Sequence, residues 1–428
     1  MDKARSTAVA VIRRVFDDGA YANIELSNAL KDGKFSDLDR RFCTTLVNGT
    51  VKCGRSLDWI ISRYVHRPID SLDGNVMAIL RIGVFQLFFL DKVPPSAIVN
   101  EAVEIAKRIC PAATKFINGV LRTMTREPDK GQFPIDDSPA SLALRTFHPR
   151  WLVERWIKQF GIEQTKMLLE IDNQPAPLTL RVNRLKTTRA ELIDMLRSLG
   201  VEAQPSEQTE DGIVCFKIKS LSDLPPLKNG LCMVQDESSM RVAHVLDPKP
   251  DEFVIDCCAA PGGKTTHIAE LMNDRGLVIS IDVHEHKLKL IGGNAQRLGL
   301  TIVKPMQLDA REVGDEFKAK ADRVLVDAPC SGLGVLRRKV DLRWRKDPKD
   351  FDRLRELQSA ILESASRALK SDGTMVYSTC TLEREENEGI VEKFLAAHDD
   401  FALVEKRTFM PHLDGTDGFF YAKLHRST

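Results

Sequence analysis

The sequence predicts a multidomain protein in which an all-α N-terminal bundle and a small α+β connecting domain precede an α/β domain with a parallel sheet. Up to about residue 127 the apolar residues follow only helical spacing. From about residue 240, short apolar runs alternate with helical segments, which is the pattern of βαβ units. The length of 428 residues also suits about three domains of roughly 150 residues each.

The N-terminal region is predicted to be a compact bundle of helices. Apolar residues from Leu72 to Leu87 fall on one helix face, and Pro94 and Pro95 end that helix. The stretch 127–139 is rich in Pro, Asp and Gly, which is typical of a linker. The predicted domain bounds are therefore 1–139 for the bundle, 140–235 for the connecting domain and 236–428 for the α/β domain.

Five apolar runs of strand length are expected to form the parallel sheet: Phe253–Ile255, Leu277–Ile281, Ile302–Leu308, Arg323–Val326 and Thr374–Tyr377. The helices predicted between them are Lys264–Met272, His286–Leu298 and Asp350–Leu369. Two later runs, Phe401–Glu405 and Gly418–Leu424, have no helix between them. We expect them to close the sheet as antiparallel strands.

The charge balance excludes some classes of protein. The chain has 62 Lys and Arg residues against 61 Asp and Glu residues, for a net charge of +1. It is therefore neither a histone-like polycation nor an acidic disordered protein. A neutral protein can still bind nucleic acid through a basic patch.

The cysteine pattern and the N-terminus indicate a cytoplasmic protein. The nine cysteines include no C-x-x-C pair and no accompanying His cluster, which favours neither a zinc site nor a disulfide framework. The first residues are charged and lack the apolar stretch of a signal peptide. The longest apolar run, Val84 to Leu90, is too short to span a membrane. We therefore expect no metal, no membrane partner and a cytoplasmic location.

Acidic residues follow four of the five predicted strands. They are Asp256, Asp282, Asp309 and Asp327, and the fifth strand leads into Cys380. Ligands of open parallel sheets bind outside the carboxyl ends of the strands, so these five positions are expected to line one crevice. A single Asp at such a place is usually a turn residue or a helix N-cap. Four in succession, with a cysteine fifth, favour a functional site.

The first of these loops, Asp256–Thr265, is built from small residues that let a ligand approach the backbone. It leads into a helix N-terminus with free N–H groups. It is not a Walker phosphate loop, because Cys258 stands where that motif requires Gly, and the G-x-G-x-x-G fingerprint is also absent. Asp282, after the second strand, can accept hydrogen bonds from both ribose hydroxyls of a nucleoside.

A basic segment follows the loop Asp327–Gly332, in which Pro329 stiffens the backbone and presents Cys330. Six of the ten residues 337–346 are basic, and Trp344 lies among them. Such a run can be a solvated face, but beside a crevice with two thiols it favours contacts with phosphates, with Trp344 packing or stacking. The basic residues assigned to nucleic-acid binding are Arg337, Arg338, Lys339, Arg343 and Arg345.

Three segments resemble motifs I, IV and VI of the Sun family of S-adenosylmethionine-dependent RNA cytosine-5 methyltransferases: Asp256–Thr265, Asp327–Gly332, and Tyr377–Cys380 with Glu386–Glu388. Two more segments match that family: Gln235–Ser239 and Asp417–Tyr421. The N-terminal region resembles the antitermination factor NusB, in Lys115–Arg122. The family's connecting domain is matched by His148–Trp151 and Arg181–Asn183. The resemblance covers nearly the whole chain, although related sequences usually carry Pro at the position of Val340.

The resemblance implies a Rossmann-like methyltransferase domain that methylates C5 of a cytosine in 16S rRNA, at position 967 in the usual rRNA numbering. It assigns the nucleophile to Cys380, product release to Cys330 and positioning of the base to Asp327, which also lies at the cofactor. Asp282 is expected to bind the ribose of S-adenosylmethionine and Asp309 its adenine amino group. The loop expected to cradle the methionine part comprises Cys258, Ala259, Ala260, Pro261, Gly262, Gly263 and Lys264.

The chemistry of these residues agrees with that reaction. C5 of cytosine is a poor nucleophile, and a thiolate that adds at C6 turns C5 into an enamine-like carbon that can attack a methyl sulfonium. Because a free thiol is only a few per cent ionised at pH 7, the thiolate needs a helix N-terminus, a cation or the sulfonium charge nearby. The cysteines assigned to the core are Cys43, Cys53, Cys110, Cys215 and Cys232.

Other functions stay open on the sequence. The same motifs serve methylation of tRNA or another RNA, and only the helical N-terminal region favours a ribosomal substrate. A non-catalytic RNA-binding or antitermination protein would tolerate loss of Cys380, Cys330 or Asp327, and all three are present. A DNA methyltransferase is disfavoured because the Pro-Cys thiol is its attacking group. We expect the enzyme to be a monomer.

Overall fold

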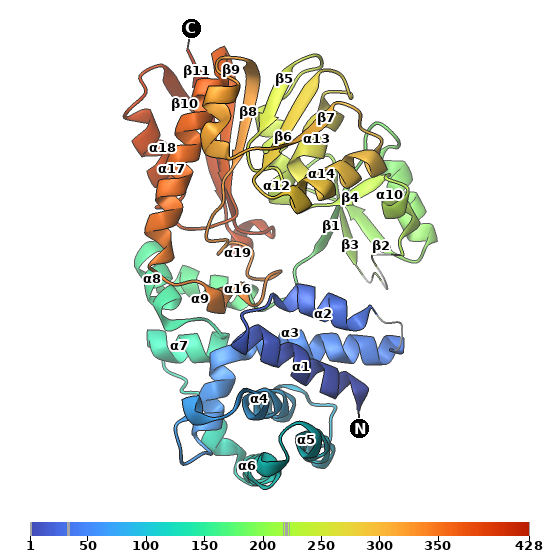
Figure 1. Ribbon diagram of the computed structural model, residues 1–428, viewed down its shortest axis with the longest axis vertical. Helices are drawn as coiled ribbons and strands as arrows, with labels where there is room; N and C mark the ends of the chain where they lie inside the picture. The colour runs from blue at the N-terminus through green and yellow to red at the C-terminus, as the bar shows by residue number, and fades with distance from the viewer. Residues whose placement is uncertain (1, 32–34, 217, 219–220, 222, 428) are drawn as a thin grey trace. The chain divides into compact units, whose positions relative to one another are not determined.

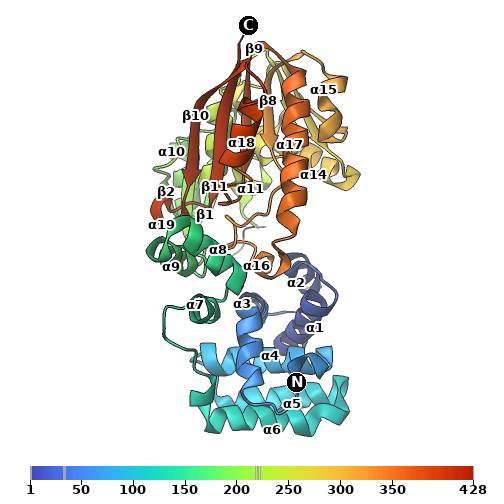
Figure 2. The same ribbon diagram turned by 90° about the vertical axis from the view of Figure 1, so that its left-hand side faces the viewer.

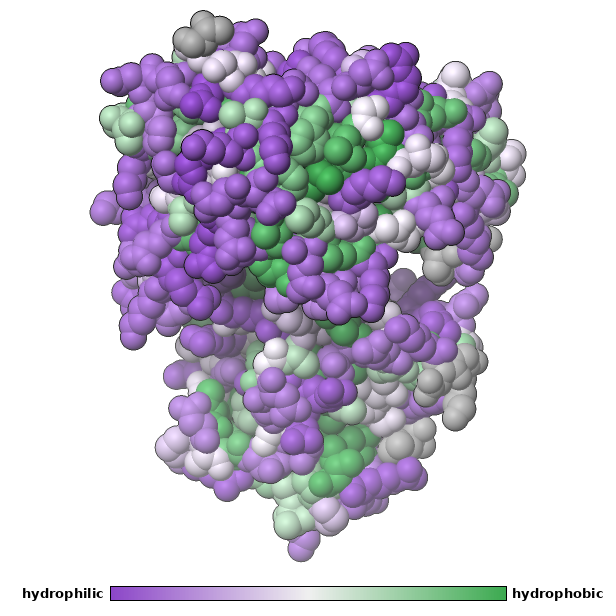
Figure 3. Space-filling model, turned by 45° about the horizontal axis from the view of Figure 1, so that its top comes forward, coloured by the Kyte–Doolittle hydropathy of each residue, from purple (hydrophilic) through white to green (hydrophobic). Residues whose placement is uncertain are grey.

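The computed structural model describes residues 2–31, 35–216, 218, 221 and 223–427. The chain divides into two compact units: Met1–Gln174 with Leu336–Lys346, and Pro175–Val335 with Asp347–Thr428. No helix in the described part of the chain has the length and apolar character needed to cross a membrane. Hydrophilic residues dominate the face of the molecule drawn in Figure 3, with smaller apolar patches among them.

The first unit is all helical, as predicted (Figure 1). Its main helices are α1 (Lys3–Asp17), α2 (Ala22–Leu30), α3 (Asp37–Ser62), α4 (Gly74–Phe89), α5 (Pro95–Ile109), α6 (Thr114–Arg126), α7 (Pro139–Thr146), α8 (Arg150–Phe160), α9 (Ile162–Ile171) and α16 (Leu342–Arg345). One apolar core joins α1 to α6, and Leu57, Ile79 and Leu121 are fully buried in it. Burial of this apolar surface is what holds the bundle together.

The bounds of the first unit differ from the predicted domain bounds. The stretch 127–139 is packed rather than a free linker: the Phe133 ring lies 5.5 Å from Trp59 and 6.5 Å from Phe89, measured between centroids. Helices α7, α8 and α9 continue the same unit as far as Gln174. The compact unit thus extends beyond residue 139, and the predicted domain bounds stay predictions.

The second unit contains two sheets. The smaller, antiparallel sheet has the order β2-β3-β1-β4, with strands β1 (Leu178–Val182), β2 (Glu202–Pro205), β3 (Gly212–Phe216) and β4 (Cys232–Val234). Its helices are α10 (Arg189–Ser198) and α11 (Pro225–Lys228). The predicted α+β character of this region is thus correct. The boundary predicted at residue 235 falls inside the second unit.

The larger sheet has the order β10-β11-β9-β8-β5-β6-β7. Its strands are β5 (Phe253–Asp256), β6 (Leu277–Asp282), β7 (Val303–Gln307), β8 (Ala321–Asp327), β9 (Leu369–Thr379), β10 (Phe401–Phe409) and β11 (Phe419–Arg426). The five predicted strands are present and run parallel. Strand β11 is antiparallel to both of its neighbours, as predicted, whereas β10 runs in the same direction as β9 because it pairs antiparallel with β11.

Helices cover both faces of the larger sheet. They are α12 (Glu237–Leu246), α13 (Gly263–Leu271), α14 (Glu285–Leu298), α15 (Val313–Glu316), α17 (Asp350–Ala368), α18 (Glu388–Leu395) and α19 (Pro411–Asp414). Because successive strand residues face opposite sides, Ile255 packs in one core cluster with α17, and Val254 packs in another with α12, α13 and α14. Figure 2 shows α17 and α18 over one of these faces. Because both faces are covered, the carboxyl ends of the strands are the place where ligands of such sheets bind.

Candidate active site

The carboxyl ends of the central strands bring the predicted residues to one edge of the larger sheet. Asp256, Asp282 and Asp327 are the last residues of β5, β6 and β8, and Cys380 directly follows β9. Strands β9, β8, β5 and β6 are neighbours in the sheet, so these side chains share one edge. Asp309 lies two residues beyond β7, the outer strand at this side. The shared edge that the sequence predicts is therefore present, whereas the roles of the residues stay predictions.

The loop between β5 and α13 is fastened to Asp256. This carboxyl group is fully buried, and its Oδ2 accepts a hydrogen bond of 2.7 Å from Thr265 Oγ1. Burial raises the pKa of Asp256 to about 7. Gly262 has φ +99°, and a Cβ there would come within 3.2 Å of Ile291 Cα, so only glycine suits the turn into α13. The side chain of Asp256 thus holds the loop that is predicted to cradle the cofactor, and the turn at Gly262 carries no side chain.

Arg181, on β1 of the small sheet, holds the first turn of α13. Its guanidinium is fully buried and donates to Gly263 O at 2.7 Å and to Thr266 Oγ1 at 3.0 Å. It also forms an ion pair of 2.8 Å with Glu270, farther along α13. The sequence resemblance included Arg181 but did not assign it this position. A residue outside the predicted α/β domain therefore holds the end of the loop that is predicted to cradle the cofactor.

The two outer carboxylates are already engaged in local contacts. Asp282 is 9% exposed, accepts a hydrogen bond of 3.0 Å from the backbone N–H of His284, and lies 3.5 Å from Lys287 Nζ. Asp309 caps the short turn that follows it and pairs with Arg311 at 2.6 Å. The hydrogen bond from Arg311 lowers the pKa of Asp309, so this side chain is a carboxylate at neutral pH.

Asp327 lies between a cation and a hydroxyl group. Lys264 Nζ is 2.7 Å from Asp327 Oδ2, and Ser378 Oγ donates to Asp327 Oδ1 at 2.9 Å. Burial alone would lower the pKa of Lys264, but Asp327, together with Cys380 and Asp256, raises it above its ordinary value. The sequence placed Lys264 in the methionine cradle. In the structure its ammonium group contacts Asp327, and its place in the methionine cradle stays a prediction.

The two predicted thiols are in direct contact. Cys330 Sγ lies 3.4 Å from Cys380 Sγ, and both residues are half-buried. The hydrogen bond with Cys380, burial and the charge of Glu386 together raise the pKa of Cys330 well above the ordinary value of a thiol. The Cys330 thiol is therefore protonated at neutral pH, and either sulfur of the pair can be the donor.

The remaining predicted thiols belong to the core or to the cofactor loop. Burial raises the pKa of the core thiols that the sequence identified, to about 11 or 12 for Cys43, Cys53, Cys215 and Cys232. Cys110 is only half-buried. In the cofactor loop, burial also raises the pKa of Cys258 well above its ordinary value. None of these groups has the exposed, ionised character of a nucleophile.

The basic segment 337–346 corrects part of the predicted nucleic-acid contact. Arg343 is fully buried in the first unit, where it donates to Phe147 O, Asn173 Oδ1 and Asp172 O at 3.0 to 3.2 Å. Arg345 donates to Gly19 O and Ala20 O and pairs with Asp341 at 2.7 Å. The assignment of Arg343 to phosphate binding is therefore wrong. The guanidinium group of Arg345 donates its hydrogen bonds to partners within the protein.

The other basic residues of that segment differ from these two. Arg338 and Lys339 are exposed, and Arg337 is half-buried. Trp344 is also internal, since its indole Nε1 donates to Val51 O at 2.8 Å. Within this charge run Arg338 and Lys339 are thus exposed, Arg343 is buried and Arg345 is half-buried, a difference that local composition cannot reveal.

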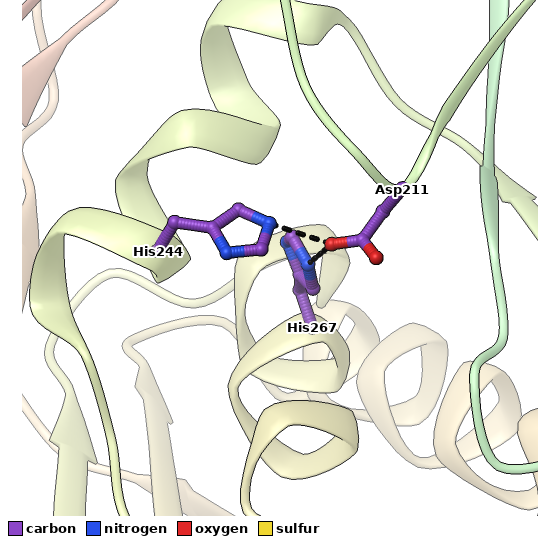
Figure 4. A group of neighbouring side chains, drawn as sticks. All are labelled: Asp211, His244 and His267. Atoms are coloured by element: carbon purple, nitrogen blue, oxygen red, sulfur yellow. Dashed lines mark hydrogen bonds and ion pairs between the residues drawn. The ribbon is translucent and has the colours of Figure 1, made fainter. Parts of the chain in front are cut away.

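Three side chains far apart in the sequence meet in the second unit (Figure 4). Asp211 Oδ2 lies 2.6 Å from His244 Nε2 on α12 and 3.0 Å from His267 Nε2 on α13. These residue types are metal ligands, but Arg184 lies 3.5 Å from the other oxygen of Asp211, and its charge opposes a cation. Burial lowers the pKa of His267 to about 3, so its ring is neutral. The geometry is that of two hydrogen bonds which fasten α12 and α13 to the turn before β3.

Comparisons with known proteins add to these observations. The family model for the 16S rRNA methyltransferase RsmB/F matches residues 243–425, the NusB family model matches residues 2–126, and the RsmF/B-like ferredoxin-like domain matches residues 148–218. The chain is 40% identical to "Probable ribosomal RNA small subunit methyltransferase B" of Bacillus subtilis (strain 168), over 99% of this chain and 98% of that protein.

Solved structures show the same architecture. The crystal structure of PH0851 superposes with a TM-score of 0.86 at 29% identity, and covers 100% of this chain and 99% of that one. NSun6 from Pyrococcus horikoshii with SFG superposes with a TM-score of 0.61 at 28% identity, over 65% of this chain and 98% of that one. With its NusB, ferredoxin-like and methyltransferase domains, the chain belongs to the family of ribosomal RNA small subunit methyltransferases B.

Proposed function

We propose that the protein methylates C5 of a cytosine in 16S rRNA, with S-adenosylmethionine as methyl donor and Cys380 as covalent nucleophile. The observation that carries this proposal is the contact between the Cys330 and Cys380 thiols beside the pair of Asp327 and Lys264. Membership of an rRNA methyltransferase family supports the substrate class. The target position, 967, follows from the resemblance alone.

The residues at the edge of the sheet fit a methyl donor of this kind. Gly262 carries no side chain that could cover the first N–H groups of α13, and such groups suit a carboxylate. Asp282 would hold the ribose and Asp309 the adenine amino group. S-adenosylmethionine, when bound, supplies an electrophilic methyl group.

The proposed reaction is consistent with the contact between the two thiols. The thiolate of Cys380 would add to C6, the C5–C6 double bond would open, and the electron pair at C5 would take the methyl group as the bond between that group and the sulfonium sulfur breaks. A base then removes the C5 proton, the C6–S bond breaks, and the double bond re-forms with the thiolate as leaving group. Cys330, at 3.4 Å, is placed to assist this release as a proton donor to the departing sulfur.

The pair of Asp327 and Lys264 suits the Watson–Crick edge of cytosine. A carboxylate accepts from the N4 amino group, and an ammonium donates to the ring acceptors N3 or O2. The ion pair of 2.7 Å sets both groups side by side before the base arrives. Recognition of the base therefore does not require a protonated Asp327, because Lys264 supplies the hydrogen-bond donor.

The RNA contacts are proposed on the exposed half of the basic segment, Arg338 and Lys339, and on the N-terminal NusB domain. Both of these side chains are exposed, so they can reach a phosphate group from the solvent side. The NusB domain would bind a part of the RNA that lies away from the target cytosine.

Two measurements test the proposal. Bisulfite mapping of RNA from cells with and without the gene should show loss of one 5-methylcytosine in 16S rRNA. Loss of a modification in tRNA would assign the same chemistry to another substrate. No lost methyl group in any RNA would favour a non-catalytic RNA-binding protein.

The nucleophile is tested with purified variants, labelled RNA and S-adenosylmethionine on a denaturing gel. Cys380→Ala should form no covalent adduct and transfer no methyl group, whereas Cys330→Ala should methylate and then stall as a protein–RNA adduct. The reverse pattern would assign the attack to Cys330 and overturn the role of Cys380.

A further inference from the structure

A buried carboxylate and a buried amide hold the loop that carries Cys330. Glu386, in the loop after β9, is fully buried, and its Oε2 accepts hydrogen bonds of 2.8 Å from the backbone N–H of Ser331 and from Gln358 Nε2. Gln358, in the middle of α17, also donates to Pro329 O at 2.9 Å. The backbone on both sides of Cys330 is therefore fixed by the same two side chains.

The partner loop, which carries Cys380, is joined to the same network. Tyr377 on β9 donates from its hydroxyl group to the backbone carbonyl oxygen of Glu386 at 2.7 Å, which anchors the backbone of Glu386 to the strand that leads into Cys380. The Ser331 hydroxyl group lies 2.7 Å from Thr381 Oγ1, one residue after Cys380. The loops that carry the two sulfur atoms are thus joined both through Glu386 and directly through the hydroxyl groups of Ser331 and Thr381.

This arrangement is costly for the fold. Glu386 Oε1 and Gln358 Oε1 are buried and have no hydrogen-bond partner among the residues that the structure describes. Burial of a carboxylate and an amide with incomplete partners costs free energy that apolar side chains at the same places would save. Such a cost at a core position between two reactive loops indicates a role in the site rather than in packing alone.

We propose that Gln358 and Glu386 are positioning residues that hold Cys330 at the distance from Cys380 needed for release of the methylated base. The inference rests on the function proposed above, since it assigns release to Cys330. Neither residue touches the substrate in this proposal. Their hydrogen bonds hold the backbone of Pro329 and Ser331.

The proposal predicts a specific kinetic defect. Gln358→Met keeps the length and volume of the side chain but removes both donors, so Pro329 O and the Glu386 carboxylate each lose a partner and the loop can shift. The attack by Cys380 should proceed, and release should slow. We expect single-turnover methyl transfer within about threefold of the unmodified enzyme, and an at least fivefold higher fraction of enzyme in covalent RNA adduct at steady state.

Glu386→Gln is the conservative variant. Its amide oxygen can still accept from Ser331 or from Gln358, but one of the two bonds weakens without the negative charge. It should show a smaller rise in trapped adduct than Gln358→Met. If Gln358→Met does not fold, as judged by its melting transition, Glu386→Gln carries the test alone.

Ser364→Ala provides the matched control on the same helix. Ser364 is buried and accepts from Gly314 N at 2.9 Å, so its loss removes a buried hydrogen bond of α17 away from the cysteine loops. It should turn over without extra adduct. Equal adduct in Ser364→Ala and Gln358→Met would mean that general loosening of α17 is the cause, and would overturn the inference.

Cys330→Ala separates failure of this inference from failure of the proposed function. If Cys330→Ala traps adduct and folded Gln358→Met does not, Gln358 has no positioning role. If Gln358→Met loses methyl transfer altogether, the network positions Cys380 instead, and the inference is also wrong. If Cys330→Ala itself traps no adduct, the role of Cys330 in release fails first.

Discussion

The indole nitrogen of Trp344 donates a hydrogen bond of 2.8 Å to the carbonyl oxygen of Val51, beside a kink in α3 at Gly54. Gly54 has φ +33° and ψ −113°, which is not helical, and a Cβ on it would lie 2.4 Å from Trp344 Nε1. The helix is therefore bent where the inserted segment Leu336–Lys346 packs into the first unit.

Replacement of Gly54 by Ala should destabilise the protein. The added Cβ clashes with the indole ring and the backbone angle is strained for any L-residue, which together cost about 2–4 kcal/mol. Urea unfolding followed by circular dichroism measures the change. Gly119→Ala is the control, because Gly119 lies in α6 with open space at its Cβ, and should raise stability by about 0.5–1 kcal/mol. Similar effects of both substitutions would contradict the role of the kink.

Arg343→Met should lower stability without a change in the salt dependence of RNA binding. Its loss leaves buried carbonyl groups of Phe147 and Asp172 without a donor, at a cost of about 1–3 kcal/mol for each group. Thermal unfolding and RNA titrations at several salt concentrations measure the two quantities.

Arg338→Gln and Lys339→Gln should behave in the opposite way. Each exposed cation that contacts a phosphate contributes about one unit to the slope of log Kd against log salt concentration. Stability should stay within about 0.5 kcal/mol for such exposed positions. An unchanged slope in both variants would remove this segment from the RNA contact.

The pKa of Asp256 predicts a pH dependence of stability. Burial raises this pKa to about 7, from an ordinary value of 3.8, so the folded state binds a proton more tightly than the unfolded state. The contribution of Asp256 to the free energy of unfolding is fully present below about pH 4 and is lost as the pH rises towards 7. Asp256→Asn keeps an acceptor for Thr265 and cannot ionise. Its unfolding free energy relative to the unmodified protein should therefore increase between pH 4 and 7 and stay constant above. A flat difference would show that Asp256 is ionised in the fold.

Asp282→Ala should weaken binding of S-adenosylmethionine. Loss of hydrogen bonds between a carboxylate and two ribose hydroxyls costs about 1.5–3 kcal/mol, or roughly 10- to 150-fold in Kd. Calorimetric titration of the purified variant measures this. Asp315→Ala, in α15 with an exposed carboxylate paired with Arg367, is the control and should leave Kd unchanged. An unaltered Kd for Asp282→Ala would remove Asp282 from the cofactor site.

Much of the fold and the edge of the site could be predicted from local sequence. Helical spacing, Pro and Gly breaks, and strand-length apolar runs are local signals, so the helical character of the N-terminal region and the presence of the parallel strands could be predicted, whereas the full extents of the first unit and of β9 could not. The residue after a parallel strand must lie at the carboxyl edge of the sheet, and this geometric rule placed Asp256, Asp282, Asp327 and Cys380 together.

Contacts between distant residues decided the rest. Trp344 and Val51 are 293 residues apart, and the burial of Arg343 depends on Phe147 and Asp172 in other helices. A run of basic residues carries no local sign of which guanidinium groups will find buried carbonyl partners. For this reason Arg343 was predicted to contact RNA and Trp344 to pack or stack there, whereas in the structure both form hydrogen bonds within the protein.

The same reason explains the network around the thiols. The sequence by itself determined that Cys330 and Cys380 follow the fourth and fifth predicted strands and that a thiolate needs a nearby cation. Only the tertiary structure decided that Lys264 pairs with Asp327, that the two sulfur atoms lie 3.4 Å apart, and that Gln358 and Glu386 bind the backbone of the loop that carries Cys330. Periodicity and spacing specify which residues share a face or an edge, whereas distances between side chains arise from packing of elements that the chain brings together from far apart.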